Sequence, residues 1–238
     1  VDASVFTRTS TPADHIMMTS GGDAMNEAVI LSRLGRRVRL VSRIGCDDAG
    51  AYIKAKCRNE NIDVRYVHEI SGLSTGVNVV LVDQAGERRF LTNPNGSLRA
   101  LEASDITPAS LAGAKLFCFA SIFVFPRIGP AELEHLFRTA RDAGLTVCAD
   151  MTSPKNGETV RDLAPALRHL DYFFANLDEA RQITERTEPK EIAAVLLAAG
   201  ARHVILKLGA DGCLAADSDG ARHIPACPDT CLLYTSPS

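Results

Sequence analysis

The chain lacks the sequence features of several protein classes. It has no apolar run near the roughly 20 residues that cross a bilayer, and no basic segment followed by an apolar one that would mark a signal peptide. Its 29 acidic residues outnumber its 26 basic ones, and no cluster of positive charge favours nucleic acid or an anionic membrane. We therefore expect a cytoplasmic protein that binds neither nucleic acid nor membrane.

Common metal and nucleotide motifs are also absent. The seven cysteines include no Cys-x-x-Cys pair and the six histidines are scattered, so no zinc site is predicted. Neither G-x-x-x-x-G-K-[ST] nor G-x-G-x-x-G occurs, which argues against an NAD-dependent oxidoreductase. Several cysteines, such as Cys118 and Cys148, lie in apolar strand-like runs, and we expect buried free thiols.

What the chain does have is an alternation of strand-like and helix-like segments. The β-rich runs are 37–44, 115–121, 145–150, 171–174, 203–208 and 213–216, and helical patterns occupy 47–61, 133–143, 177–184 and 188–199. Such alternation is typical of an open parallel sheet with helices on its faces.

The stretch 75–92 departs from this alternation. Two β-rich runs flank 83–87, and Gly86 suits a tight hairpin turn. We expect a hairpin appended to the sheet, with the Thr-rich segment 6–20 as a candidate partner.

The most informative segment is G-G-D-A-M-N-E-A at 21–28. Gly21 and Gly22 allow a tight turn and close approach of a ligand to the backbone. Asn26 would lie in the first turn of the following helix, where its amide could address the hydroxyls of a polyol. Taken alone, the glycine pair indicates a simple turn before a packed helix.

Later segments also carry polar residues or glycines just after strands. Asn176 and Glu179 have the spacing of a helix capping box. Lys207, Gly209 and Gly212 follow a strand in V-I-L-K-L-G-A-D-G-C, where an ordinary turn is the plain interpretation.

Asp150 ends a strand-like run and is open to two interpretations. It could be a loop or cap residue. It could equally line an active-site crevice, because such crevices lie at the carboxyl ends of parallel strands.

Together these segments resemble the ribokinase-type (PfkB) family of carbohydrate kinases over residues 1–230. The segment 21–45 meets that family's N-terminal signature of a Gly pair, a small residue, Asn, Ala, Gly and Gly, and I-G-C-D-D-A-G at 44–50 is similar to its continuation. The resemblance implies a three-layer α/β/α sheet with a small β lid built from parts of 6–20 and 72–96. It further implies transfer of the γ-phosphoryl group of ATP, with Mg²⁺, to a hydroxyl of a sugar. The lid is also a candidate surface for a homodimer.

The resemblance also implies roles for individual residues. Sugar contacts are implied for Gly21, Gly22, Asn26 and Asp150, nucleotide contacts for Asn176, Lys207, Gly209 and Gly212, and a place near Mg²⁺ for Glu179. Lys207 stands where the family more often has Thr. The family's D-x-N-x-R is reduced here to Asp150 with a basic residue nearby.

The family's second signature, D-T-x-G-A-G-D, does not occur in the chain. We therefore expect the catalytic Asp beyond the C-terminus, an early strand missing at the N-terminus, and a non-native tail at 231–238, C-L-L-Y-T-S-P-S. Two alternatives stay open, namely a non-catalytic sugar- or nucleotide-binding fragment and a nucleoside kinase of the same family.

Overall fold

A computed structural model describes residues 7–83, 88–93 and 95–227. Its contacts divide the described residues into two compact units: unit 1 comprises those up to 99, and unit 2 those from 100 on. Within the described ranges, no helix combines the length and the apolar character needed to cross a membrane. The predictions that concern 1–6, the turn residues 84–87 and the suspected tail lie outside the described residues.

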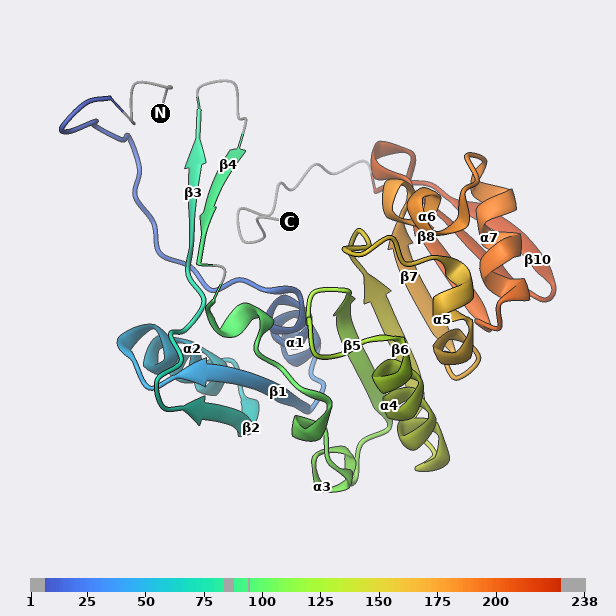
Figure 1. Ribbon diagram of the computed structural model, residues 1–238, viewed down its shortest axis with the longest axis horizontal. Helices are drawn as coiled ribbons and strands as arrows, with labels where there is room; N and C mark the ends of the chain where they lie inside the picture. The colour runs from blue at the N-terminus through green and yellow to red at the C-terminus, as the bar shows by residue number, and fades with distance from the viewer. Residues whose placement is uncertain (1–6, 84–87, 94, 228–238) are drawn as a thin grey trace. The chain divides into compact units, whose positions relative to one another are not determined.

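Unit 1 begins with helices that pack on a short parallel sheet (Figure 1). Its elements are α1 (Asp23–Arg33), β1 (Val38–Gly45), α2 (Asp48–Asn59), β2 (Ile62–Ile70), β3 (Asn78–Val82), β4 (Arg88–Thr92) and the 3-10 turn η2 (Ser97–Arg99). β1 and β2 pair in parallel, from Val38 opposite Ile62 to Gly45 opposite Ile70. The predicted strand at 37–44 and helix at 47–61 are confirmed as β1 and α2, whereas β2 was not predicted.

The core of unit 1 is small. The buried residues of this cluster are Met25, Ala28, Leu40, Ile44, Cys57, Ile62 and Val67. Met25 from α1 and Cys57 from α2 meet inside it, with their sulfur atoms 3.3 Å apart. This packing holds α1 on the parallel pair and so determines where the Gly21–Gly22 turn lies within unit 1.

The predicted hairpin is confirmed as β3 and β4, which form a separate antiparallel sheet. Asn78 pairs with Thr92 at one end and Val82 with Arg88 at the other. The expected partner segment is not found in this sheet, because the described residues 7–20 form neither helix nor strand. Pro12 lies in that segment and removes a backbone donor that a paired strand would need.

Unit 2 contains the larger sheet. Its elements are η3 (Ala103–Asp105), α3 (Pro108–Leu111), β5 (Leu116–Ile122), α4 (Pro130–Asp142), β6 (Thr146–Met151), α5 (Val160–Leu167), β7 (Tyr172–Asn176), α6 (Leu177–Thr184), α7 (Pro189–Ala198), β8 (His203–Lys207), η4 (Gly209–Asp211), β9 (Cys213–Asp217) and β10 (Gly220–Ile224). The strands are ordered β10-β9-β8-β7-β6-β5.

The expected parallel sheet is corrected to a mixed one. β5 to β8 run parallel, but β9 is antiparallel to both β8 and β10. The reason is connection length: only short turns join β8, β9 and β10, and a parallel pair needs a crossover of a dozen or more residues.

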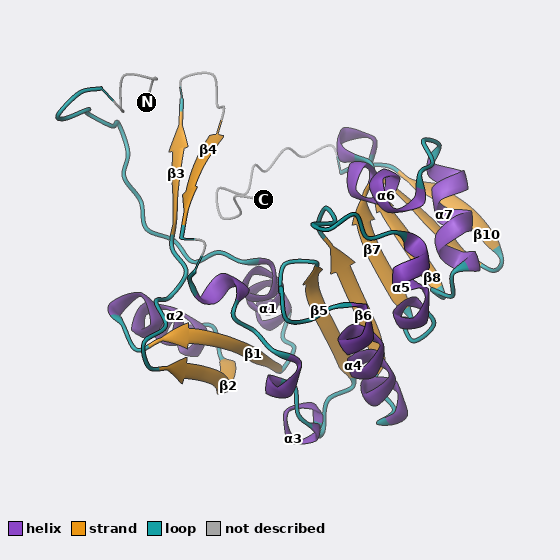
Figure 2. Ribbon diagram, viewed as in Figure 1, coloured by secondary structure: helices purple, strands orange, loops and turns teal. Residues whose placement is uncertain are grey.

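The helices that link the parallel strands share one face of the sheet, as Figure 2 shows for α4, α5 and α7. The reason is the strand order. β6, β7 and β8 are each added on the same side of the preceding strand, and right-handed crossovers in one direction place the linking helices on one face. Phe137 of α4 packs on Phe119 and Phe117 of β5, with ring centroids 5.7 and 6.4 Å apart.

Strand alternation corrects one expectation about the cysteines. The six cysteines in the described ranges form no disulfide, but among them only Cys57 is buried, and Cys118 is exposed. Because Phe119 faces α4, its neighbour Cys118 must face the opposite side of the sheet. Cys148, which pairs with Cys118, is half-buried on that same side, called the open face below.

Candidate functional site

The glycine turn of unit 1 has a backbone that only glycine adopts easily. Gly22 is the N-cap of α1, with φ 95° and ψ 135°, in the left-handed half of conformational space. No atom lies within 4 Å of the place where a Cβ would stand. The glycine is therefore required by the backbone angle, and the space beside Gly22 is open within the described residues.

Asn26 lies one helical turn after Gly22, as predicted. Its backbone N–H donates to the Gly22 carbonyl oxygen at 2.9 Å, and its side chain is half-buried. Asp23 stands between them in the first turn, where the positive end of the helix favours a carboxylate. The structure thus brings Gly21, Gly22 and Asn26 together at the start of α1.

Unit 2 collects the other predicted residues near the carboxyl ends of neighbouring strands. Asp150 is in β6, Asn176 ends β7 and Lys207 ends β8. Asn176 pairs with Lys207, and Asp150 pairs with Phe174, two residues before Asn176. The register places all three on the open face, at the sheet edge where open α/β folds bind ligands.

Asp150 has a structural partner on β5. Its Oδ1 accepts from the Ser121 N–H at 2.5 Å. Ser121 and Phe123 have positive φ, 65° and 76°, and the β5–β6 register shifts between Phe119 and Ile122. Asp150 therefore helps to hold an irregular strand end, the kind of backbone that often occurs at functional sites.

Asn176 and Glu179 form the predicted capping box of α6. Asn176 Oδ1 accepts from the Glu179 N–H at 2.8 Å, and Glu179 Oε2 accepts from the Asn176 N–H at 3.0 Å. Both side chains are half-buried. Glu179 Oε1 has no hydrogen-bond partner among the described residues, so the cap leaves one carboxylate oxygen available.

The two glycines after β8 differ in what requires them. Gly212 has φ 88°, and a Cβ there would lie 2.1 Å from the Ile224 carbonyl oxygen. Gly209 has φ 64° with no atom within 4 Å of its Cβ position. Packing against the end of β10 thus accounts for Gly212, while Gly209 and the exposed Lys207 border open space.

The donor set suits a nucleotide-bound Mg²⁺ better than a metal held by protein alone. Across the described ranges, no group of three or more His, Cys, Asp and Glu side chains could hold a metal ion. Mg²⁺ bound to phosphates usually takes only one or two carboxylates and keeps several waters. The remaining oxygen of Glu179 could supply such a ligand.

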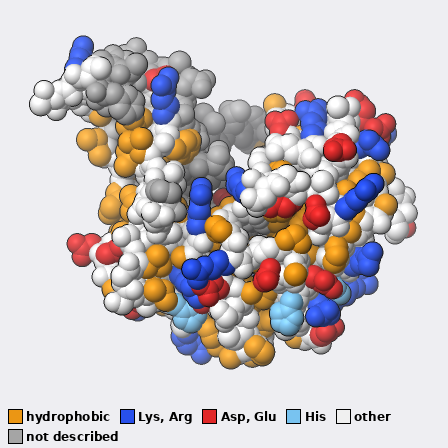
Figure 3. All heavy atoms as spheres, in the orientation of Figure 1, with side chains coloured by type: hydrophobic (Ala, Val, Ile, Leu, Met, Phe, Trp, Pro, Cys, Tyr) orange, Lys and Arg blue, Asp and Glu red, His pale blue; other side chains and the backbone are white. Residues whose placement is uncertain are grey.

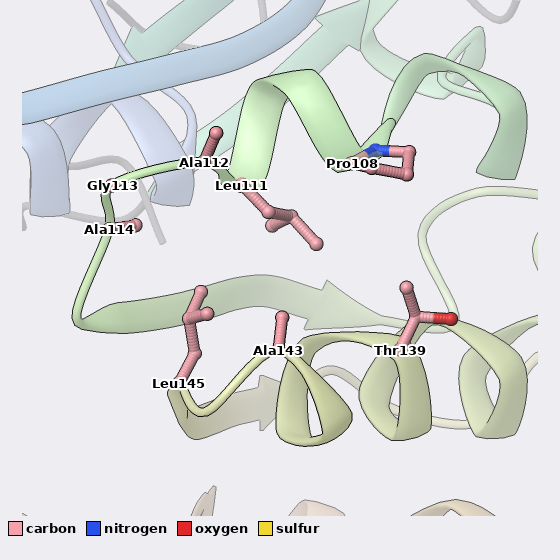
Figure 4. A pocket seen from close by; sticks show the side chains of 8 residues that line it. All are labelled: Pro108, Leu111, Ala112, Gly113, Ala114, Thr139, Ala143 and Leu145. Atoms are coloured by element: carbon pink, nitrogen blue, oxygen red, sulfur yellow. The ribbon is translucent and has the colours of Figure 1, made fainter.

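A small cavity in unit 2 lies away from these residues (Figure 4). It has a volume of about 130 Å³ and is lined by Pro108, Leu111, Ala112, Gly113, Ala114, Thr139, Ala143 and Leu145. Ala114 and Leu145 come just before β5 and β6, so the cavity is at the amino ends of these strands. Its lining contains no charged side chain, and it does not match the predicted sugar or nucleotide contacts.

The structure shows a contact that the sequence did not indicate, between Asp47 and Thr75. Asp47 caps α2 by accepting from the Gly50 N–H at 2.8 Å, and its Oδ2 accepts from the Thr75 N–H at 2.8 Å. The Thr75 hydroxyl, the Thr75 N–H and the Gly50 N–H lower the pKa of Asp47. Asp47 could be recognised as a helix cap from sequence, but no local pattern pointed to Thr75.

The chain is similar in sequence to curated proteins that are longer than the region that aligns with it. The aminoimidazole riboside kinase of Salmonella typhimurium is 27% identical over 213 residues, which cover 87% of this chain and 66% of that protein. The 2-dehydro-3-deoxygluconokinase of Bacillus subtilis is 27% identical over 203 residues, which cover 80% of this chain and 61% of that protein. The chain thus spans less than two thirds of the length of these relatives.

Solved structures share the fold. Aminoimidazole riboside kinase from Salmonella enterica, complexed with aminoimidazole riboside and an ATP analogue, matches with a TM-score of 0.70 at 22% identity, covering 88% of this chain and 69% of that one. An E. coli structure in complex with ATP and Mg²⁺ matches with a TM-score of 0.74 at 18% identity, covering 94% and 74%. These likenesses confirm the predicted ribokinase-like α/β fold. Residues 2–232 match the sequence profile of the pfkB family carbohydrate kinases, and the chain belongs to that family.

Proposed function

We propose that the protein is an ATP-dependent carbohydrate kinase that transfers the γ-phosphoryl group to a hydroxyl of a sugar or sugar-like substrate. The observation that carries the proposal is the family match over residues 2–232. The grouping of Asn176, Glu179 and Lys207 at adjacent strand ends supports it. Free thiols and the use of ATP suit the cytoplasm, where we place the enzyme.

The strand ends of unit 2 would bind the nucleotide. Phosphoryl transfer depends on positioning and charge stabilisation more than on covalent chemistry by the protein. Lys207 offers a cation and Gly209 an open backbone, next to Asn176, whose Oδ1 is held by the cap. The Asn176 amide N–H groups could then donate to phosphate oxygens, and Glu179 Oε1 would hold Mg²⁺, which neutralises phosphate charge when bound.

The glycine turn of unit 1 would bind the sugar. The open space beside Gly22 admits a ligand to the backbone, and the Asn26 amide can both donate to and accept from hydroxyls. We assign Asp150 to the sugar as well, as the resemblance implies. The β3–β4 hairpin would act as a lid that excludes water, which limits wasteful hydrolysis of ATP.

The hairpin also supports a homodimer. Figure 3 shows hydrophobic side chains on its surface, and the exposed ones are Val77, Val79, Val82, Phe90 and Leu91, each 43–53% exposed. The register sets Val79 beside Leu91 on one face and Val80 beside Phe90 on the other, so both faces are apolar. A lid that covers substrate with one face leaves the other for a second copy of the chain. Sedimentation tests the homodimer. We expect the unchanged protein to be a dimer that Leu91→Lys or Phe90→Lys dissociates. A monomer at about 100 µM, a concentration well above a micromolar Kd, would contradict the homodimer.

A nucleoside-like substrate is the second candidate. The observation that favours it is the similarity to an enzyme named for its action on aminoimidazole riboside, a ribose attached to a base. The two candidates differ only in the acceptor, so one assay separates them.

The test has a binding arm and a turnover arm. Calorimetry compares MgATP with NADH, and ADP release is measured with ketoses, aldoses, sugar acids and nucleosides, using this chain and the full-length product of its gene. MgATP binding and sugar-dependent ADP release are expected from the full-length product. Binding of MgATP without turnover on any acceptor would favour a binding protein, and NADH binding in place of ATP would overturn the proposal.

A further inference from the structure

The I-G-C-D-D-A-G segment at 44–50 converges on the foot of the β3–β4 hairpin. Both carboxylate oxygens of Asp47 are used: Oδ1 accepts from the Gly50 N–H and Oδ2 from the Thr75 N–H, each at 2.8 Å. The Gly45 N–H donates to Thr75 Oγ1 at 2.9 Å. Thr75, which is 7% exposed, is thereby held by the end of β1 and the start of α2.

Close backbone contact explains the two glycines of this segment. A Cβ on Gly45 would lie 2.2 Å from the Leu73 carbonyl oxygen, and a Cβ on Gly50 would lie 2.3 Å from the Gly45 carbonyl oxygen. Neither position has room for a side chain, although neither glycine has a positive φ. The spacing of the segment therefore serves a junction of three chain segments and leaves no space there for a ligand.

The other end of the hairpin is tied to the same place. The Gly76 N–H donates to Ser97 Oγ at 3.0 Å, and the Ser97 N–H donates to the Ser74 carbonyl oxygen at 2.9 Å. Gly96 lies so close that its Cβ would be 3.1 Å from Gly76 Cα. Both ends of the hairpin segment are thus held side by side, next to Thr75, and β3 and β4 extend away from this foot (Figure 1). Apolar side chains of the two strands are exposed.

We propose that Asp47 and Thr75 form a hinge clasp that fixes the foot of the hairpin, which makes Asp47 a positioning residue for the lid. The role as a lid rests on the function proposed above, whereas the clasp itself does not. Among the described strands, β3 and β4 pair only with each other, and an isolated two-stranded hairpin is only marginally stable. The foot therefore affects both where the hairpin lies and how firmly its two strands stay paired. The clasp would decide where the hairpin lies when it closes.

One substitution separates the clasp from the helix cap. Asn is as good an N-cap as Asp, so Asp47→Asn can keep the bond from the Gly50 N–H. The second oxygen then becomes an NH₂ group, which cannot accept from the Thr75 N–H. Asp47→Asn should therefore spare α2 and release the hairpin foot. Asp48→Asn, the same change of charge one residue later in the first turn of α2, is the matched control.

Hydrogen exchange of backbone amides tests the clasp without any substrate. Exchange in 76–83 and 88–93 should rise about tenfold or more in Asp47→Asn, because a lost charge-assisted bond of this kind shifts local opening by that amount. Exchange in α2 and throughout β5–β8 should stay as in the unchanged protein, and Asp48→Asn should have no effect. Thr75→Val should raise hairpin exchange as Asp47→Asn does. Thr75→Ser, which keeps the hydroxyl, should leave hairpin exchange slow. Unchanged exchange in the hairpin of Asp47→Asn or of Thr75→Val overturns the clasp.

Kinetics of the full-length enzyme test the positioning role. Asp47→Asn should raise the KM for the sugar about tenfold while the KM for ATP stays unchanged, since only the lid has moved. Faster hairpin exchange with unchanged sugar KM would show a structural clasp that does not position the lid. If the unchanged enzyme phosphorylates none of the acceptors, the proposed function fails, and hydrogen exchange alone decides whether the clasp exists.

Discussion

The two units hold their candidate residues in different ways. In unit 2, Asp150 and Asn176 lie at the carboxyl ends of two strands of a six-stranded sheet, and both side chains accept hydrogen bonds from backbone N–H groups. The core beside this sheet contains fully buried side chains such as Phe137 of α4 and Phe173 of β7. In unit 1, a small core supports a glycine turn and a hairpin with exposed apolar residues. A rigid frame suits the placement of phosphates, and a lightly packed one suits a part that must open and close.

The largest expected effect tests this contrast in packing. Phe137→Ala should lower the free energy of unfolding by about 3–5 kcal/mol, because it leaves a cavity beside Phe117 and Phe119. Phe90→Ala, at a side chain that is 43% exposed in the hairpin, should cost less than about 1 kcal/mol. Urea unfolding followed by circular dichroism measures both. Equal losses would mean that the hairpin is as firmly packed as the large sheet.

The glycines after β8 sharpen the comparison within unit 2. Gly212→Ala should destabilise the protein by at least about 2 kcal/mol, since the backbone angle is strained and the new Cβ meets the Ile224 carbonyl. Gly209→Ala should cost about 1–2 kcal/mol, because only the angle opposes it. Thermal unfolding of the two variants decides the order. The reverse order would contradict a structural role for Gly212 and favour a packing role for Gly209.

A division of ligands between the units predicts opposite kinetic changes. Asn26→Ala should weaken use of the sugar by about 1–3 kcal/mol, the cost of an unmatched buried hydrogen-bonding group, and should leave ATP binding unchanged. Lys207→Ala should weaken ATP binding and spare the sugar. Steady-state kinetics of the full-length enzyme give both KM values. Unchanged sugar kinetics in Asn26→Ala would remove that residue from the site.

Glu179 can be tested for a role beyond its cap. Glu179→Gln keeps a side chain that can serve a capping box, so unfolding should change by less than about 0.5 kcal/mol. The Mg²⁺ concentration needed for half-maximal rate should nevertheless rise, because a neutral amide binds a hard cation poorly. Glu179→Ala, the comparison variant, should lose stability as well. A Mg²⁺ requirement that does not change in Glu179→Gln rules out the metal role.

The smallest expected effect concerns acid and unit 1. The Arg33 guanidinium, which donates to Glu60 Oε2 at 2.9 Å, lowers the pKa of Glu60 to about 2 from the usual 4.5. A carboxyl with a lowered pKa stabilises the fold above its unfolded pKa, and that stabilisation is lost as pH falls from 4.5 toward 2. Glu60→Gln should flatten this decline only slightly, because the Arg33 side chain is exposed and salt screens the pair. Urea midpoints from pH 6 to pH 2 measure the slope. An identical slope in the variant would mean that the pair does not contribute.

Elements set by local pattern were predicted well. The predicted helix 177–184 coincides with α6, and its capping box has the predicted partners, because both depend on residues three or four apart. β2 was missed although its alternation can be read in I-D-V-R-Y-V, and α5 contains Pro165, which argues against a helix. β10 is short and exposed throughout, so no apolar pattern announced it.

The local features could be predicted from the sequence: the glycine turn before α1, the caps of α2 and α6, the hairpin, and the family to which the chain belongs. Only the tertiary structure decided which face Cys118 takes, that β9 reverses the sheet, and that Thr75 meets Asp47. The physical reason is distance along the chain. Asp47 and Thr75 are 28 residues apart, and their contact depends on how β1, α2 and the hairpin foot approach one another, which no local pattern of residues encodes.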